Sequence, residues 1–209
     1  VEPQDSGGFT VIQGAVEFGH TELVKMLITR GANITTATNL ELFQTACRKG
    51  FVEIVQILFD LGVDVNVSVS ENHWTPLIWA SRYGHVETVK FLIEKGANLE
   101  ARGKDMVTPL YCAVTNGHIK AAQLLLDHNP DVDTRNIYDW TPLHSAVKEG
   151  YTELVTMLIT KGANIATANE NGVGPFYTAC HEGFIEIARL LFDVGVDVNI
   201  PTQEDQCTP

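Results

Sequence analysis

The sequence predicts an all-α solenoid in which short antiparallel helix pairs stack in a row and are joined by protruding loops. Two observations support this prediction. The tripeptide Thr-Pro-Leu recurs at a constant step of 33 residues, beginning at Thr75, Thr108 and Thr141. A glycine keeps the same step, at Gly84, Gly117, Gly150 and Gly183. A fixed period of this length is typical of repeat arrays, in which each unit buries its apolar surface only against its neighbours.

Residues 140–165 show how one unit is expected to fold. Thr141 can cap a helix with its hydroxyl, and Pro142 then occupies the first helical position, where a missing N–H costs nothing. Gly150 ends this helix, because glycine accepts the left-handed conformation of a C-terminal cap. The second helix carries an apolar stripe made of Leu154, Val155, Leu158 and Ile159. Gly162 ends it, so each unit is predicted to be two short helices and a loop.

These motifs resemble the ankyrin repeat, whose pattern reads Thr-Pro-Leu-His-x-Ala, then Gly-His, then Gly-Ala-Asp-Val-Asn. The matching stretches are Thr141-Pro142-Leu143-His144 with Ala146, then Gly84-His85 and Gly117-His118, then Gly62-Val63-Asp64-Val65-Asn66. The resemblance covers almost the whole chain. It implies an ankyrin-repeat solenoid whose loops are β-hairpin-like.

The resemblance divides the chain into six repeats of a single ankyrin-repeat domain, residues 1–209. Their expected ranges are about 9–36, 37–66, 67–101, 102–134, 135–167 and 168–200. Residues 201–209 are expected to begin a truncated seventh repeat, as in a fragment of a longer array. Repeat two has Glu41-Leu42-Phe43-Gln44 in place of Thr-Pro-Leu-His, which puts Leu40 at the expected loop tip. This departure leaves open where its first helix begins.

The sequence also contains a longer repetition, which spans several of the 33-residue repeats. Residues 21–34 recur as residues 152–165, and residues 43–66 recur as residues 176–199. These pairs are more alike than adjacent repeats are, which indicates duplication of a block of four repeats. A duplicated block favours a large array with several related binding surfaces.

Charge and composition argue against several functional classes. The net charge of −12 argues against a nucleic-acid partner. No apolar run approaches the roughly 18 residues that cross a bilayer, so no membrane insertion is expected. The four cysteines form no CxxC pair and no zinc spacing, so no metal or cofactor is expected. Cys47 and Cys180 share one repeat position and are expected to be buried thiols.

The chain is not expected to be an enzyme. It contains no GxGxxG, P-loop, HExxH or GxSxG motif, and no residue is assigned a catalytic role. We also expect no small-molecule substrate. The composition fits a cytoplasmic protein, with the nucleus as a second possibility.

The resemblance implies a protein–protein interaction module, part of a scaffold, adaptor or regulatory protein. In the family, partners are usually held on a concave surface made of loop tips and one face of each first helix. The candidate partner-binding residues at these positions are Trp74, Tyr138 and Trp140 on the loops and Arg48, Lys49, Trp79, Arg82, Tyr83 and Lys148 on the first helices. Trp, Tyr and Arg are enriched at binding hot spots. The three arginine and lysine side chains of repeats two and three predict a partner segment with acidic and apolar residues.

Other interpretations stay open at this stage. Trp74 and Trp140 could instead stack along the loops and brace neighbouring repeats. The chain could be a ligand-sensing regulatory domain of a larger enzyme or channel, with a phosphate held by Arg48, Lys49 and Arg82. Finally, Asn66 and Asn199 match the pattern for asparagine hydroxylation in ankyrin repeats, although Asp-Val-Asn is also simply common at this repeat position. Both asparagines are therefore candidates for that modification.

Overall fold

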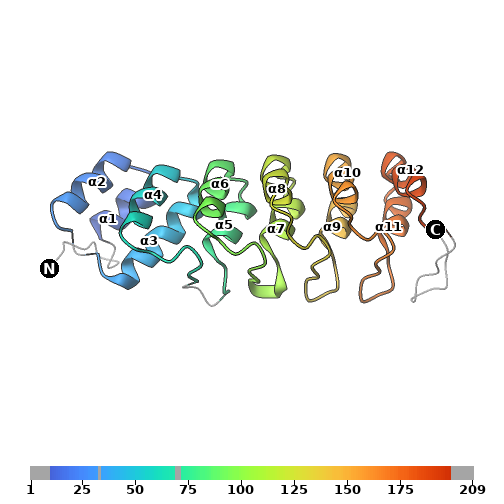
Figure 1. The fold of residues 1–209 in the computed structure, drawn as a ribbon, viewed down its shortest axis with the longest axis horizontal. Coiled ribbons are helices and arrows are strands. Elements are labelled where there is room, and N and C mark those ends of the chain that lie inside the picture. Colours follow the sequence, from blue (N-terminus) through green and yellow to red (C-terminus); the bar gives the residue numbers. More distant parts are fainter. Residues whose placement is uncertain (1–9, 33, 69–71, 199–209) are drawn as a thin grey trace.

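The computed structural model describes residues 10–32, 34–68 and 72–198, and in these ranges the chain is an elongated row of helix pairs (Figure 1). The first helices of the pairs are α1 (Val11–Glu17), α3 (Thr36–Lys49), α5 (Pro76–Arg82), α7 (Pro109–Thr115), α9 (Pro142–Lys148) and α11 (Pro175–His181). The second helices are α2 (Thr21–Thr29), α4 (Val52–Asp60), α6 (Val86–Glu94), α8 (Ile119–Leu126), α10 (Thr152–Thr160) and α12 (Ile185–Asp193). A short 3-10 turn, η1, spans Lys104–Met106.

The helices form two layers, with even-numbered helices in the upper row of Figure 1, odd-numbered helices below them, and loops projecting beneath. Each helix packs on the equivalent helix of the next pair. Periodic apolar side chains fill the space between the layers and are fully buried, at Leu58, Leu92, Leu125, Leu158 and Leu191. Small residues let the first helices approach, at Ala46, Ala80, Ala113, Ala146 and Ala179. The all-α solenoid predicted from the period is confirmed.

Threonine caps start several first helices. The Thr141 hydroxyl accepts a hydrogen bond from the backbone N–H of His144, and Pro142 occupies the first turn, as the sequence predicts. Thr10, Thr75 and Thr108 cap α1, α5 and α7 in the same way. These hydroxyls satisfy backbone N–H groups that a helix start leaves without a partner.

The glycine after each first helix has a positive φ, and Gly84 shows a second physical reason for glycine at this position. Gly84 has a φ of +69°, which favours glycine, and a Cβ atom on it would lie 2.5 Å from the ring of His118. The His118 ring therefore rests on the preceding repeat, and its Nε2–H donates to the Arg82 carbonyl oxygen at 2.8 Å. His85 makes the same contact with Gly50 and the Arg48 carbonyl. These histidines join adjacent repeats.

Repeat two starts earlier than the other repeats. Helix α3 has 14 residues, and the Thr35 hydroxyl caps it by accepting from the N–H of Thr38. No proline or glycine interrupts the chain between Thr35 and Gly50, so the helix continues through the stretch where other repeats have a loop. Leu40 therefore lies within α3, and the prediction of a loop tip there is wrong.

The loops are hairpin-like in their hydrogen bonds, although the structure contains no β-strand within the described ranges. One bond closes each of three loops, from the N–H of Gly103 to Val107, of Asn136 to Trp140 and of Asn169 to Val173. Other bonds join successive loop tips, from the N–H of Lys104 to Asn72, of Ile137 to Asp105 and of Glu170 to Tyr138. The loops thus form a continuous hydrogen-bonded edge that fixes the spacing of the repeats.

The last described repeat shows one error in the sequence interpretation. Cys47 is buried on α3 as expected, but its counterpart Cys180 on α11 is exposed. Cys47 is covered by the following repeat, whereas no described helix lies beyond α11 and α12, so Ile185 and Phe192 are exposed as well. Residues 199–209, with Asn199 and the expected start of a seventh repeat, lie outside the described residues.

Candidate partner-binding surface

Three aromatic side chains and one arginine of repeat three form what we call the aromatic cluster: Trp74, Trp79, Tyr83 and Arg82. Trp79 lies on α5, and Tyr83 follows one turn later as the C-cap residue of that helix. Their rings are stacked at 6.1 Å between centroids with an angle of 5°. The ring of Trp74 lies 4.5 Å from that of Trp79. The guanidinium carbon of Arg82 lies 5.0 Å from the centre of the Trp74 ring, a cation–π distance.

The cluster combines a bracing role with an exposed surface. Trp74 is half-buried, and the indole packs against Gly103 of the next loop, where a Cβ atom would lie 2.5 Å from the ring. Trp79 is also half-buried, while Tyr83 is 47% exposed. Trp74 therefore does brace its neighbour, and Trp79 and Tyr83 present a rigid aromatic surface on the solvent side of α5.

The basic residues of repeat two converge on one carboxylate. Arg48 Nη2 lies 3.3 Å from Glu17 Oε2, and Lys49 Nζ lies 2.5 Å from Glu17 Oε1. This contact joins α3 to α1. Arg48 and Lys49 share the single carboxylate of Glu17, and Arg82 adds a further positive charge. The first-helix surface of repeats two and three therefore keeps an excess of positive charge. Sequence reasoning missed Glu17, although it holds the same repeat position as Arg48.

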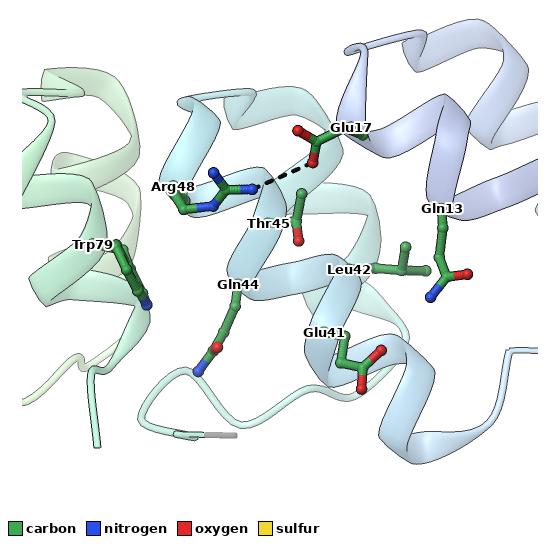
Figure 2. A pocket seen from close by; sticks show the side chains of 8 residues that line it. All are labelled: Gln13, Glu17, Glu41, Leu42, Gln44, Thr45, Arg48 and Trp79. Atoms are coloured by element: carbon green, nitrogen blue, oxygen red, sulfur yellow. Dashed lines mark hydrogen bonds and ion pairs between the residues drawn. The ribbon is translucent and has the colours of Figure 1, made fainter. Parts of the chain in front are cut away.

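A cavity of about 380 Å³ lies between α1, α3 and α5, and we call it the repeat-two cavity (Figure 2). Its lining residues are Gln13, Glu17, Glu41, Leu42, Gln44, Thr45, Arg48 and Trp79. Leu42 is buried, and Gln44 donates from Nε2 to the Trp74 carbonyl oxygen at 3.2 Å. Glu41 is exposed, and within the described residues its carboxylate makes no hydrogen bond or ion pair. The cavity joins residues of three repeats at the edge of the aromatic cluster.

The remaining candidates lie two repeats away and do not join this site. Lys148 on α9 pairs with Glu182 at 2.5 Å, and this contact holds the pKa of the Glu182 carboxyl below its ordinary value. Tyr138 is 53% exposed on its loop. Trp140 is half-buried, with its ring 5.9 Å from that of His144. The two groups of candidates therefore belong to separate parts of the array.

Asn66 has a structural role in the loop region. Its Nδ2 donates to the Gly96 carbonyl oxygen at 3.3 Å, and its Oδ1 accepts from the backbone N–H of Asn98 at 2.7 Å. Both ends of the carboxamide thus tie repeat two to repeat three. Hydroxylation of Asn66 stays a prediction.

The described residues offer little for metal or membrane chemistry. Within the ranges that the structure covers, no three His, Cys, Asp or Glu side chains gather so as to hold a metal ion. None of the described helices is both long enough and apolar enough to cross a bilayer.

A stack of helix pairs with a continuous core and an exposed first-helix surface defines a helical repeat solenoid. The chain matches the family model for ankyrin repeats over residues 12–103, 100–169 and 138–202. It therefore belongs to the ankyrin repeat family, as its motifs predict. Members of this family generally act as interaction modules that bind protein partners.

Similar proteins carry the same repeats within much longer chains. The chain is 34% identical over 89 residues to human ankyrin repeat and KH domain-containing protein 1, covering 41% of this chain and 4% of that protein. It is 31% identical over 97 residues to rat (Rattus norvegicus) ankyrin repeat and SAM domain-containing protein 6, covering 45% and 11%. It is 37% identical over 65 residues to ankyrin repeat, SAM and basic leucine zipper domain-containing protein 1 of Atelerix albiventris, covering 31% and 14%. The chain thus spans a small part of each relative's length.

Proposed function

We propose that this chain is a non-enzymatic module that binds a partner polypeptide on the first helices and loops of repeats one to three. It would do so as part of a scaffold, adaptor or regulatory protein in the cytoplasm, or alternatively in the nucleus. The observation that carries the proposal is the aromatic cluster beside the repeat-two cavity. Exposed Tyr83 and Arg82 next to a half-buried Trp79 have the composition of a binding hot spot.

The internal duplication supports placing recognition on the first helices. Helices α2 and α10, which are second helices of duplicated repeats, differ at one position, Lys25 against Thr156. Their first helices α1 and α9 share only the buried Ala-Val pair. The inter-repeat ion pair is kept with its sign reversed, because Glu17–Lys49 corresponds to Lys148–Glu182. Buried positions have been retained while the exposed charges of the first helices have diverged.

The surface suits a partner segment that carries acidic and apolar residues. Trp79 and Tyr83 offer an apolar wall that is already ordered by stacking, so little side-chain entropy is lost on binding. Arg82 lies on the Trp74 ring and forms no ion pair within the described residues. Its guanidinium is therefore free to donate hydrogen bonds to a carboxylate of the partner. Arg48 and Lys49 add a second positive group, since they share the single carboxylate of Glu17.

A binding experiment with matched variants tests the proposal. A partner would be captured from lysate with the whole chain and identified by mass spectrometry, and the purified partner titrated by calorimetry. The triple variant Trp79→Ala, Arg82→Ala, Tyr83→Ala should lose binding while keeping native helicity. A control triple variant on α6 of the same repeat, Glu87→Ala, Lys90→Ala, Glu94→Ala, should bind like the wild type.

Two results would count against the proposal. Equal partner binding by both triple variants would move the contact away from the aromatic cluster. Unchanged binding after charge reversal at Arg48, Lys49 and Arg82 would show that the partner is not recognised through acidic residues. A ligand-sensing role would instead show as a rise in melting temperature with nucleotides or phosphate and no captured protein, although pairing with Glu17 leaves Arg48 and Lys49 less free for a phosphate.

A further inference from the structure

We propose that the repeat-two cavity recognises a dipolar partner segment, with a basic side chain at Glu41, a large apolar side chain against Trp79 and an acidic side chain at Arg48. This inference rests on the proposed function and specifies the partner's charge order. Its starting point is the early start of α3, which creates a feature that the other described repeats lack.

Glu41 stands where other repeats have their capping threonine. The equivalent residues Thr75, Thr108 and Thr141 are 8%, 2% and 0% exposed, and their hydroxyls accept hydrogen bonds from the helix backbone. In repeat two this task has moved six residues upstream to Thr35. Position 41 is thereby released from capping, and it carries an exposed carboxylate that no hydrogen bond or ion pair of the described residues uses.

The two ends of the cavity carry opposite charge. Glu41, Thr45 and Arg48 lie at i, i+4 and i+7 of α3 and so share one helix face. Seven residues of helix separate Glu41 from Arg48 by about 10 Å along the axis. Figure 2 shows Glu41 at one end of this stripe and the Arg48–Glu17 pair at the other.

The cavity is small and has apolar side chains in its lining. Leu42 and Trp79 line it together with Thr45, and its volume of about 380 Å³ lies near the lower end of ligand-site sizes. That volume suits one large side chain with its neighbours. The site therefore fits a segment in which one apolar residue lies between a basic and an acidic residue.

The spacing of the charges sets the spacing in the partner. In a polyproline II segment, residues three apart lie on the same side at about 9 Å. In a helix, residues seven apart lie on one face at about 10 Å. A peptide with only one of the two charges would satisfy one end of the cavity and leave the other unpaired.

The duplicated block supplies an internal comparison. In repeat six, Gly174 stands at the position of Glu41, and His181 and Glu182 stand at the positions of Arg48 and Lys49. Both charged ends of the site are thus missing from the copy, while the neighbouring Thr-Ala dipeptide is kept. The dipolar arrangement is a property of repeats one to three.

Selection from a phage-displayed random peptide library on the whole chain tests the inference. Wild-type chain should select peptides with a basic residue, an apolar residue and an acidic residue at fixed spacing. Glu41→Lys should bind the selected peptide about tenfold more weakly, because an attraction is replaced by a repulsion of similar size. It should regain affinity for the same peptide with its basic residue changed to Glu. Glu94→Lys on α6, which makes the same charge change on an exposed helix, should leave affinity unchanged.

The outcomes separate this inference from the proposed function. Selected peptides that need Trp79 and Tyr83 but bind wild type and Glu41→Lys equally would overturn the dipolar inference and leave the proposed function standing. Selected peptides that bind the Trp79→Ala, Tyr83→Ala variant as well as wild type, or no selection at all, would overturn both. Circular dichroism of each variant confirms that a loss reflects recognition and not folding.

Discussion

Protonation of His144 is expected to destabilise repeat five at mildly acidic pH. The side chain is 1% exposed. Its Nδ1 accepts from the Thr141 N–H at 3.2 Å, and its Nε2–H donates to the Val173 carbonyl oxygen at 3.3 Å. The first bond requires the neutral ring, because only an unprotonated Nδ1 can accept a hydrogen bond. Burial lowers the pKa of His144 to about 4 from its ordinary value of 6.5. At mildly acidic pH the unfolded chain therefore binds a proton at His144 more readily than the native state does.

The size of the effect follows from the two pKa values. Above pH 6.5 the ring is neutral in both states and contributes no pH dependence. Between pH 6.5 and pH 4 the unfolded chain holds one more proton, so the free energy of unfolding falls as pH falls. At about 1.4 kcal/mol per pH unit, the loss reaches roughly 3 kcal/mol at pH 4. This is a large part of the 5–15 kcal/mol typical of folded domains.

The chain itself indicates the best control variant. At the equivalent position in repeat two, Gln44 donates from Nε2 to the Trp74 carbonyl oxygen, as His144 does to Val173. In repeat one, the Oε1 atom of Gln13 accepts from the Thr10 N–H at 2.8 Å. Glutamine can therefore make both bonds of His144 without titrating. The variant His144→Gln should keep the fold and remove this contribution to pH dependence.

Urea unfolding followed by circular dichroism from pH 7.5 to pH 4.5 measures the difference. All other titrating groups are common to both chains and cancel in the comparison. Relative to His144→Gln, the wild type should lose roughly 2–3 kcal/mol between pH 6.5 and pH 4.5. Two curves that stay parallel across this range would show that His144 binds its proton equally well in both states, and the reasoning from burial would be wrong.

Three further predictions concern the joints between repeats. Gly84→Ala should lower the free energy of unfolding by about 2–4 kcal/mol, measured by urea titration, because the alanine meets both a positive φ and the His118 ring; equal stability would contradict this. Thr75→Ala should cost about 1 kcal/mol through loss of the α5 cap, whereas Thr75→Ser should restore most of it. A double-mutant cycle of Glu17→Ala and Arg48→Ala should give a coupling below about 1 kcal/mol that shrinks in high salt, and a salt-independent coupling would argue against a half-exposed pair.

Local chemistry explains why much of the fold could be predicted. Thr141 capping, Pro142 in the first turn and the glycine ending each first helix depend on residues a few positions apart. The period of the apolar residues predicts the same helix pair in every repeat along the chain, since each repeat of a solenoid contacts mainly its neighbours. These signals lie within one repeat and can be read without knowing how repeats pack.

Features that depend on two repeats were harder to predict. Glu17 pairs with Arg48 across 31 residues, and only the packed register of α1 on α3 brings them together. Cys47 and Cys180 share one repeat position, which predicts burial of both thiols, but Cys180 is exposed because no described repeat follows it. The repeat pattern does not predict the start of α3, because the capping residue Thr35 lies six residues before the position of the cap in other repeats.

The same departure connects fold to recognition. The capping threonines of repeats three to five, Thr75, Thr108 and Thr141, are buried and bonded to the helix backbone, so this position is not free to contact a partner there. Moving the cap to Thr35 extends α3 and releases position 41, where Glu41 now faces solvent at the edge of the cavity. Departures from local sequence rules are expected at functional sites, where the local cost is compensated by what the site does. The place where the repeat pattern fails in this chain is therefore the place where its selectivity for a partner should be tested.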